Sequence, residues 1–142
     1  MISVLITGGS GFIAGELRAR LEEFPGRYRA AGVSLRGGEW RENGFAGWDC
    51  VVHTAGIAHV HGDPSMAETY FRVNRDLALE AARRAKADGV RQFIFLSSIN
   101  VYGDPPPAGK RRIIGPDTPP APANAYARSK LEAEEGLREL SG

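Results

Sequence analysis

Cysteine is almost absent from this chain, because Cys50 is the only one in 142 residues. A single thiol excludes a framework of disulfide bonds, and the apolar run around Cys50 predicts a small residue of the core. Long hydrophobic runs are missing as well, since none approaches the roughly 18 apolar residues of a membrane-spanning helix. The first residues form a strand-like run without the layout of a signal peptide. We therefore expect a cytoplasmic protein without a membrane partner.

An excess of charge of either sign is also missing. Lys and Arg number 18 and Asp and Glu 17, which gives a formal net charge of +1. This balance gives no reason to expect nucleic acid or an anionic surface as a partner. The hydrophobic share of 42% and the charged share of 25% are ordinary for globular proteins. At this length we expect one domain, residues 1–142, that is large enough to bury a core.

Three glycines gather directly after the first apolar run, Ile2–Thr7. Gly8, Gly9 and Gly11 follow residues rich in β-branched side chains, and a helix-like pattern comes next. Glycine lets the backbone turn tightly and approach a ligand where a Cβ atom would collide. The following helix directs its unpaired N–H groups at the same place, which suits a pyrophosphate. The spacing fits two dinucleotide-binding patterns, one from Gly9 and one from Thr7, while a turn without a ligand is the alternative.

The end of the second expected strand, Tyr28–Leu35, bears on the choice of dinucleotide. An acidic residue there would bond both hydroxyls of the adenosine ribose and favour NAD. No acid lies between Glu23 and Glu39. Ser34 and Arg36 stand at this point instead, and this pair suits a 2′-phosphate better. The sequence thus leans slightly towards NADP, with an ordinary solvated arginine as the alternative.

Strand-like and helix-like patterns alternate over the first 98 residues. The run Asp49–Thr54 reads as a strand and precedes Ala55 and Gly56, whose small size suits close approach to a cofactor. A long helical segment follows from Pro64 to Ala87, and Gln92–Ser97 is expected to be a buried strand. The alternation predicts an α/β fold with a doubly wound, parallel, Rossmann-like sheet.

Three other segments carry weaker signals. Residues 36–48 are too short and too rich in glycine for a full helix–strand–helix excursion. His59 and His61 lie close together in a probable loop, but this spacing is weak evidence for a metal, and we predict no metal site. Seven of the nine prolines fall within 103–124 and predict a semi-rigid loop. Its central cations, residues 110–112, either meet an anionic substrate or are merely solvated.

A serine, a tyrosine and a lysine form a candidate catalytic set. Tyr126 and Lys130 share one face of the last expected helix, Ala125–Leu140, which begins behind the good N-cap Asn124. Ser98 follows the last expected strand, at the rim where parallel α/β sheets bind ligands. A phenol beside an ammonium group and a positive nicotinamide ring loses its proton more readily, so Tyr126 would act as acid and base. Ser98 would hold the substrate oxygen, and a surface Tyr–Lys pair without function is the alternative.

Together these residues resemble the extended short-chain dehydrogenase/reductases, the NAD-dependent epimerase/dehydratase family, and within it the nucleotide-sugar 4-epimerase-like branch. The matching segments are Thr7–Ala14, His53–Gly56, Val73–Asn74, Phe93–Gly103 and Tyr126–Lys130. The resemblance implies that the catalytic residues are Ser98, Tyr126 and Lys130, the last also anchoring the nicotinamide ribose. The expected cofactor contacts are Gly8, Gly11, Phe12, Ile13, Thr54, Ala55, Gly56, Tyr126 and Lys130, besides Arg36 from the reasoning above. The resemblance also makes Asn74 a structural residue that interrupts its helix.

The resemblance also implies a reaction and partners. In that family a hydride moves between a sugar carbon and the nicotinamide of NAD or NADP. The substrate would be a nucleotide-activated sugar such as a UDP- or dTDP-sugar. Family members often dimerise through the helices that correspond to residues 64–87 and 125–140, so a homodimer is expected.

Three departures from the family pattern limit what the chain inherits. Ala14 replaces the third glycine, which is tolerable because that position mainly serves helix–strand packing. The stretch 36–48 is shorter than the family's third strand and helix, which leaves one edge of the adenine pocket open. The chain stops at Gly142, before the family's substrate-binding C-terminal part. A truncated or degenerate NAD(P)-binding module without turnover, with a regulatory or interaction role, is therefore the alternative function.

Overall fold

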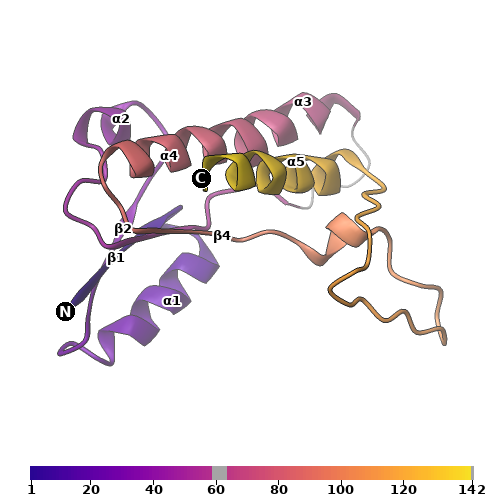
Figure 1. Cartoon of the computed structure of the whole chain (residues 1–142), viewed down its shortest axis with the longest axis horizontal. Helices are drawn as coiled ribbons and strands as arrows, with labels where there is room; N and C mark the ends of the chain where they lie inside the picture. Colours follow the sequence, from indigo (N-terminus) through magenta and orange to yellow (C-terminus); the bar gives the residue numbers. More distant parts are fainter. Residues whose placement is uncertain (59–63, 142) are drawn as a thin grey trace.

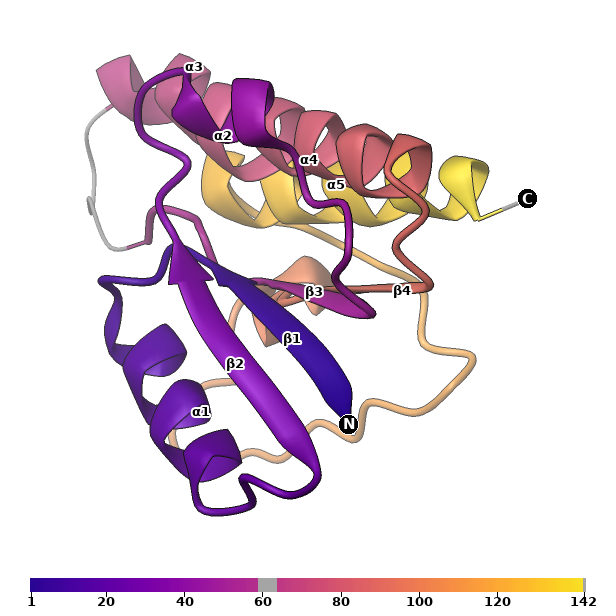
Figure 2. The same cartoon turned by 90° about the vertical axis from the view of Figure 1, so that its left-hand side faces the viewer.

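The fold is a parallel sheet with helices on both faces (Figures 1 and 2). This computed structural model describes residues 1–58 and 64–141. The strands lie in the order β2-β1-β3-β4, each neighbouring pair parallel, and are β1 Ile2–Thr7, β2 Tyr28–Val33, β3 Cys50–His53 and β4 Gln92–Phe95. The doubly wound, Rossmann-like architecture expected from the sequence is therefore confirmed.

The helices divide unequally between the two faces of the sheet. Helix α1, Phe12–Glu22, lies on one face (Figure 2). The other face carries α2 Glu39–Asn43, α3 Ala67–Tyr70, α4 Leu77–Ala87 and α5 Ala125–Leu140. As expected, α5 begins behind Asn124, whose Oδ1 accepts a hydrogen bond from the Ala127 N–H at 2.9 Å. Residues 103–124 contain no helix or strand, as their prolines predict, and extend away from the sheet (Figure 1).

The core consists of two apolar clusters, one on each face of the sheet. Successive residues of a strand point to opposite faces, so Val4 and Ile6 pack towards α1 while Leu5 packs towards α4. Cys50 is buried in the α1-side cluster, which confirms its prediction as a small core residue. On the other side, α4 presents a face of alanines that allows close packing, namely Ala78, Ala81, Ala82 and Ala85.

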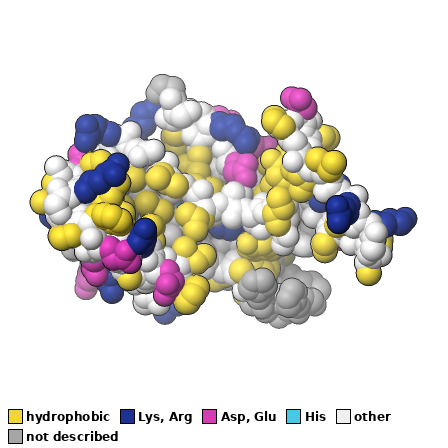
Figure 3. All heavy atoms as spheres, turned by 90° about the horizontal axis from the view of Figure 1, so that it is seen from below, with side chains coloured by type: hydrophobic (Ala, Val, Ile, Leu, Met, Phe, Trp, Pro, Cys, Tyr) yellow, Lys and Arg dark blue, Asp and Glu magenta, His cyan; other side chains and the backbone are white. Residues whose placement is uncertain are grey.

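The expectation of a buried strand over Gln92–Ser97 is wrong in two respects. The strand ends at Phe95, and its pairing is with β3 on one side, so within the described residues it forms an edge of the sheet. Helix α1 packs against β1 and β2 and does not cover this part of the sheet, which leaves Ile94 39% exposed. Figure 3 looks onto the α1 side and shows hydrophobic side chains over much of this face.

The predicted long helix over Pro64–Ala87 is divided into four parts. A 3-10 turn, Pro64–Met66, leads into α3, and a π-helical stretch, Phe71–Asp76, separates α3 from α4. Asn74 lies inside the π-helical stretch and is fully buried. Such stretches are rare and are often found at functional sites. The sequence indicates an irregularity at Asn74, and the structure identifies its form.

The shortened stretch 36–48 forms only one short helix, α2, as its length predicts. Trp40 and Phe45 stack with ring centroids 5.8 Å apart, and both side chains are buried in the α4-side cluster. This stretch therefore contributes core residues although it adds no strand to the sheet.

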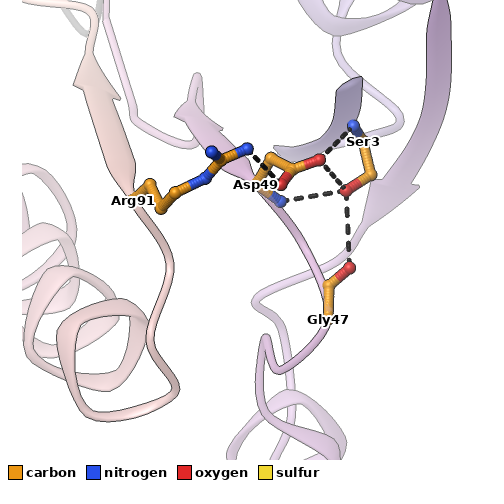
Figure 4. A network of polar contacts seen from close by, with 4 residues as sticks. All are labelled: Ser3, Gly47, Asp49 and Arg91. Atoms are coloured by element: carbon orange, nitrogen blue, oxygen red, sulfur yellow. Dashed lines mark hydrogen bonds and ion pairs between the residues drawn. The ribbon is translucent and has the colours of Figure 1, made fainter. Parts of the chain in front are cut away.

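A polar network fixes the amino-terminal ends of three strands (Figure 4). The Asp49 carboxylate accepts hydrogen bonds from the Ser3 N–H and the Ser3 hydroxyl, both at 2.8 Å, and pairs with Arg91 at 2.6 Å. The Ser3 hydroxyl also accepts from the Asp49 N–H at 2.9 Å. The bonds from Ser3, followed by that from Arg91, lower the pKa of Asp49 to about 2. This network lies at the end of the sheet opposite the glycine bend.

Candidate functional site

The glycine bend lies at the carboxyl end of β1, and its backbone leaves no room for side chains at two positions. Gly8 has a φ of 72°, which side-chain-bearing residues rarely adopt, and a Cβ there would lie 3.0 Å from the Ala55 backbone. A Cβ on Gly9 would lie 2.8 Å from the Cα of Gly32 on β2. The bend is closed by the Gly11 N–H, which donates to the Gly8 carbonyl at 2.8 Å. The glycines thus allow the bend, β2 and the segment after β3 to approach one another at the carboxyl-terminal rim of the sheet.

Helix α1 begins at this bend without a side-chain cap. Gly11 is its N-cap residue, and its first turn contains no acidic residue. Its first N–H groups therefore have no helical partner and no competing carboxylate nearby, an arrangement that suits an anion. Phe12 and Ile13 in the same turn are 82% and 54% exposed. The bend and the helix start fit the pyrophosphate of a dinucleotide.

The segment after β3 is tied to the end of β1 by two threonines. The Thr54 hydroxyl donates to the Thr7 carbonyl at 2.6 Å. The Ala55 N–H donates to the Thr7 hydroxyl at 3.4 Å. Thr54 and Ala55 therefore lie against the glycine bend, and Gly56 follows as an exposed backbone position. The structure brings these three predicted cofactor residues together with Gly8.

His53, at the end of β3, is a buried residue to which the sequence reasoning assigned no role. Its ring is 1% exposed and lies 5.7 Å from the Phe93 ring and 5.9 Å from the Phe95 ring. Its Nδ1 lies 3.0 Å from the Thr7 hydroxyl, and its Nε2 has no hydrogen-bond partner among the described residues. Burial, and then the positive charge of Lys130, lower the pKa of His53 to about 3. The only sequence signal for this residue was a polar side chain closing an apolar strand.

Asn74 links the segment after β3 to α5. Its Oδ1 accepts from the Ile57 N–H at 2.9 Å, and its Nδ2 donates to the Ile57 carbonyl at 3.0 Å. The same Nδ2 donates to the Ser129 hydroxyl at 3.2 Å. The π-helical stretch therefore holds both the loop that contains Gly56 and the helix that carries Lys130. This agrees with the structural role that the resemblance implies for Asn74.

Lys130 reaches from α5 to the rim at which the strands end. It is 7% exposed, and its Nζ donates to the Leu96 carbonyl at 3.0 Å, directly after β4. A Cβ on Gly56 would lie 3.3 Å from this Nζ and 3.1 Å from Asn74 Oδ1. Burial lowers the pKa of Lys130 to about 8. The ammonium group and the glycine bend therefore face the same rim of the sheet, linked by residues 54–57.

The remaining candidate residues lie around this rim. The Tyr126 ring is half-buried and contacts the Tyr70 ring edge-to-face at 5.7 Å. Ser98 lies three residues beyond β4, and its hydroxyl accepts from the Asn100 N–H at 3.3 Å at the start of the 3-10 turn Ile99–Tyr102. That turn packs against α5. Arg36 lies beyond β2 with an exposed side chain. The backbone N–H of Arg36 donates to the Ser34 hydroxyl at 3.2 Å.

The metal signal considered in the sequence falls on His59 and His61, which lie outside the described residues. Among residues 1–58 and 64–141, no three His, Cys, Asp or Glu side chains gather in a way that could hold a metal ion. In the same ranges, no helix is long and apolar enough to cross a membrane.

Comparison with known proteins identifies the family. The model of the NAD-dependent epimerase/dehydratase family matches residues 4–141. The chain belongs to this family. Human UDP-glucose 4-epimerase is 27% identical over 96% of the chain and 48% of its own length. UDP-glucose 4-epimerase of Streptomyces lividans is 26% identical over 92% of the chain and 45% of its length.

Solved structures of other proteins share this fold. A short-chain dehydrogenase/reductase superfamily protein from Agrobacterium tumefaciens with bound NAD superposes with a TM-score of 0.77 at 26% identity, over 96% of this chain and 44% of that one. RMD from Pseudomonas aeruginosa, complexed with NADPH, gives a TM-score of 0.73 at 28% identity, over 95% and 47%. The chain thus spans about half the length of the proteins it matches.

Proposed function

We propose that this chain carries the cofactor-binding and catalytic part of an NAD(P)-dependent oxidoreductase of the epimerase/dehydratase type that acts on a nucleotide-activated sugar. The observation that supports this most strongly is the position of Lys130, whose Nζ bonds the Leu96 carbonyl at the rim that also holds the glycine bend. Such a position is what the proposed tyrosine–lysine pair requires. UDP-glucose 4-epimerases among the relatives favour a UDP-sugar, with a dTDP-sugar as the second choice.

Different residues at the rim bind different parts of the dinucleotide. Gly8 and Gly11 shape the bend, and the first backbone N–H groups of α1, at Phe12 and Ile13, would hold the pyrophosphate. The small residues after β3, Thr54, Ala55 and Gly56, let the backbone come close to the rest of the dinucleotide. When bound, the nicotinamide supplies the position that accepts and returns a hydride.

The chain's own side chains handle the proton and the substrate oxygen. Tyr126 takes a proton from a sugar hydroxyl or returns one to the carbonyl, and Ser98 holds the same oxygen by a hydrogen bond. Lys130 supplies a positive charge one helical turn from Tyr126 and donates to ribose hydroxyls. The buried surroundings of Lys130 strengthen these electrostatic effects.

Turnover and cofactor binding test this proposal together. Nicotinamide fluorescence measures binding of NADH and NADPH, and product analysis with UDP- and dTDP-sugars measures turnover. We expect Tyr126→Phe to retain binding and lose turnover by about 10²- to 10⁴-fold. Tyr28→Phe, which removes a hydroxyl at the start of β2, serves as the matched control and keeps both. Turnover that survives Tyr126→Phe removes Tyr126 from its role.

The cofactor preference is a separate part of the proposal, and it leans towards NADP. The exposed side chain of Arg36 follows β2, where it can meet a 2′-phosphate, and one structural neighbour binds NADPH while another binds NAD. We expect Arg36→Ala to weaken NADPH binding roughly tenfold and to leave NADH binding nearly unchanged. Arg83→Ala on the exposed face of α4 is the control. Equal losses for the two cofactors contradict the preference.

The geometry of the glycine bend is also compatible with a second function. A dinucleotide-binding module without turnover, in a regulatory or interaction role, needs only the bend and the uncapped start of α1. Binding of NADH or NADPH without turnover of any tested sugar supports this function. Turnover by the chain contradicts it.

A homodimer through the helices of residues 64–87 and 125–140 also belongs to the proposal. Helices α4 and α5 lie side by side (Figure 1), and a Cβ on Gly136 would lie 2.7 Å from the Leu79 side chain. Such close packing gives a continuous two-helix surface. Light scattering should give twice the chain mass of 15.3 kDa, and a mass of one chain at all concentrations contradicts the dimer. The cytoplasmic location expected from the sequence stays a prediction.

A further inference from the structure

The Lys130 ammonium group is buried without a counter-ion. The side chain is 7% exposed, and no carboxylate pairs with it among the described residues. A buried charge is costly unless polar or polarisable groups replace its water. The Leu96 carbonyl, 3.0 Å from Nζ, provides one such group. One hydrogen bond leaves most of the ammonium surface to other neighbours.

An aromatic ring provides the second neighbour. The Lys130 Nζ lies 4.7 Å from the centroid of the Phe95 ring, within the range of a cation–π contact. Phe95 is the last residue of β4 and precedes Leu96, so ring and carbonyl come from consecutive residues at the strand end. The same ring lies 5.9 Å from the His53 ring. Because burial lowers the pKa of His53 to about 3, that imidazole is neutral near pH 7.

We propose that Phe95 is a positioning residue for Lys130: its ring face and the adjacent Leu96 carbonyl hold the Lys130 ammonium group in place and in its charged form at the rim of the sheet. The contact itself is a property of the free chain. Its consequence for catalysis, a fixed cation beside Tyr126, rests on the proposed function. Neither the family match nor the sequence pattern assigns a role to this ring.

The other polar groups around Lys130 do not supply its charge balance. His53 from β3 is neutral near pH 7, and Asn74 from the π-helical stretch is committed to Ile57 and Ser129. On α5, Tyr126 lies one turn before Lys130. Glu134 lies one turn after it and accepts hydrogen bonds from Ser97 and Arg138. The ring of Phe95 is therefore the main group whose removal should disfavour the charged form.

The chain allows a direct measurement of this effect because it contains only three lysines, Lys86, Lys110 and Lys130. Lysine labelled with ¹³C at the ε-carbon gives one NMR signal for each, and Lys130→Arg assigns the signal of interest. A pH titration of the free chain then gives the pKa of Lys130. The signals of Lys86 and Lys110 serve as internal references in the same samples.

The experiment replaces Phe95 by phenylalanines with one and three ring fluorines, which weaken the ring's negative face and nearly keep its shape. We expect the pKa of Lys130 to fall stepwise with fluorination, and by about one unit in Phe95→Leu. Phe93→Leu removes a ring at a similar distance from His53 and should leave the pKa unchanged. The fluorinated chains keep the test valid if Phe95→Leu does not fold.

The outcomes separate this inference from the proposed function. A stepwise fall confined to position 95 supports it, whether or not the chain binds NADH. The inference is overturned if the pKa of Lys130 does not change with fluorination of Phe95. It is also overturned if Phe95→Leu and Phe93→Leu shift this pKa equally in folded protein. If the wild-type chain does not bind NADH or NADPH in the separate fluorescence measurement, this result counts against the proposed function alone.

Discussion

Asn74 and Ile57 are joined by a pair of hydrogen bonds that resembles one rung of a sheet. The amide oxygen of Asn74 accepts from the Ile57 N–H, and its amide nitrogen donates to the Ile57 carbonyl. Both backbone groups of Ile57 are thus satisfied by one side chain in the π-helical stretch. The loop that contains Gly56 is thereby fixed to the helical layer, next to Lys130.

Replacing Asn74 by alanine should destabilise the chain by about 2–3 kcal/mol, because the Ile57 N–H and carbonyl lose their partner inside the protein. Ser129→Ala removes one of the three bonds of Asn74 and should cost about 1 kcal/mol. Urea denaturation measures both free energies of unfolding. Equal effects of the two substitutions would show that the Ile57 bonds contribute little.

The buried His53 should make stability depend on pH. Its pKa is about 3 in the folded chain against an ordinary value of 6.5, so the unfolded chain binds one more proton between these values. The stability contributed by the neutral ring is complete above pH 6.5 and is lost as the pH falls towards 3. We expect the free energy of unfolding to fall by about 1.4 kcal/mol per pH unit between about pH 6 and 4.

His53→Gln is the matched variant for this titration, because glutamine can still bond Thr7 but does not titrate. Urea denaturation at a series of pH values should show the slope in the wild type and a smaller slope in the variant. Parallel curves for the two proteins would mean that His53 is protonated at the same pH in the folded and unfolded chain.

Two glycines of the same region should respond in opposite directions to alanine. A Cβ on Gly9 would lie 2.8 Å from the Gly32 Cα, so Gly9→Ala should cost about 1–3 kcal/mol of stability. Gly15 lies within α1 with no atom near its Cβ position, and Gly15→Ala should stabilise the chain by about 0.5–1 kcal/mol. Thermal unfolding distinguishes the two, and a tolerated Gly9→Ala contradicts the close approach of bend and β2.

The stability that Asp49 contributes should come more from its hydrogen bonds with Ser3 than from its ion pair with Arg91. Asp49 accepts two bonds from Ser3, whereas its ion pair involves an arginine side chain that is 76% exposed. We therefore expect Asp49→Ala to lower the midpoint of thermal unfolding clearly and Arg91→Ala to lower it only slightly. Because the pKa of Asp49 is lowered from 3.8 to about 2, this contribution is present above pH 3.8 and is lost as the pH falls towards 2. If Asp49→Ala and Arg91→Ala lower the midpoint equally at neutral pH, the ion pair supplies the stability that Asp49 contributes.

Much of the fold follows from local sequence patterns. The apolar run Ile2–Thr7 gives a central strand, and Asn124 marks the start of α5 through a capping rule that acts over a few residues. The order of strands and helices could be predicted for the same reason. The extent of β4 could not, because its edge position depends on what lies beside it in the sheet.

The sequence by itself determined the glycine bend, the helix that follows it and the presence of a tyrosine–lysine pair on one helical face. Only the tertiary structure decided that Lys130 is buried against Phe95 and Leu96, that His53 is neutral, and that Asn74 holds Ile57. The physical reason is that a bend or a cap depends on neighbouring residues along the chain. The charge and partners of a buried side chain depend on residues that packing brings together from distant positions.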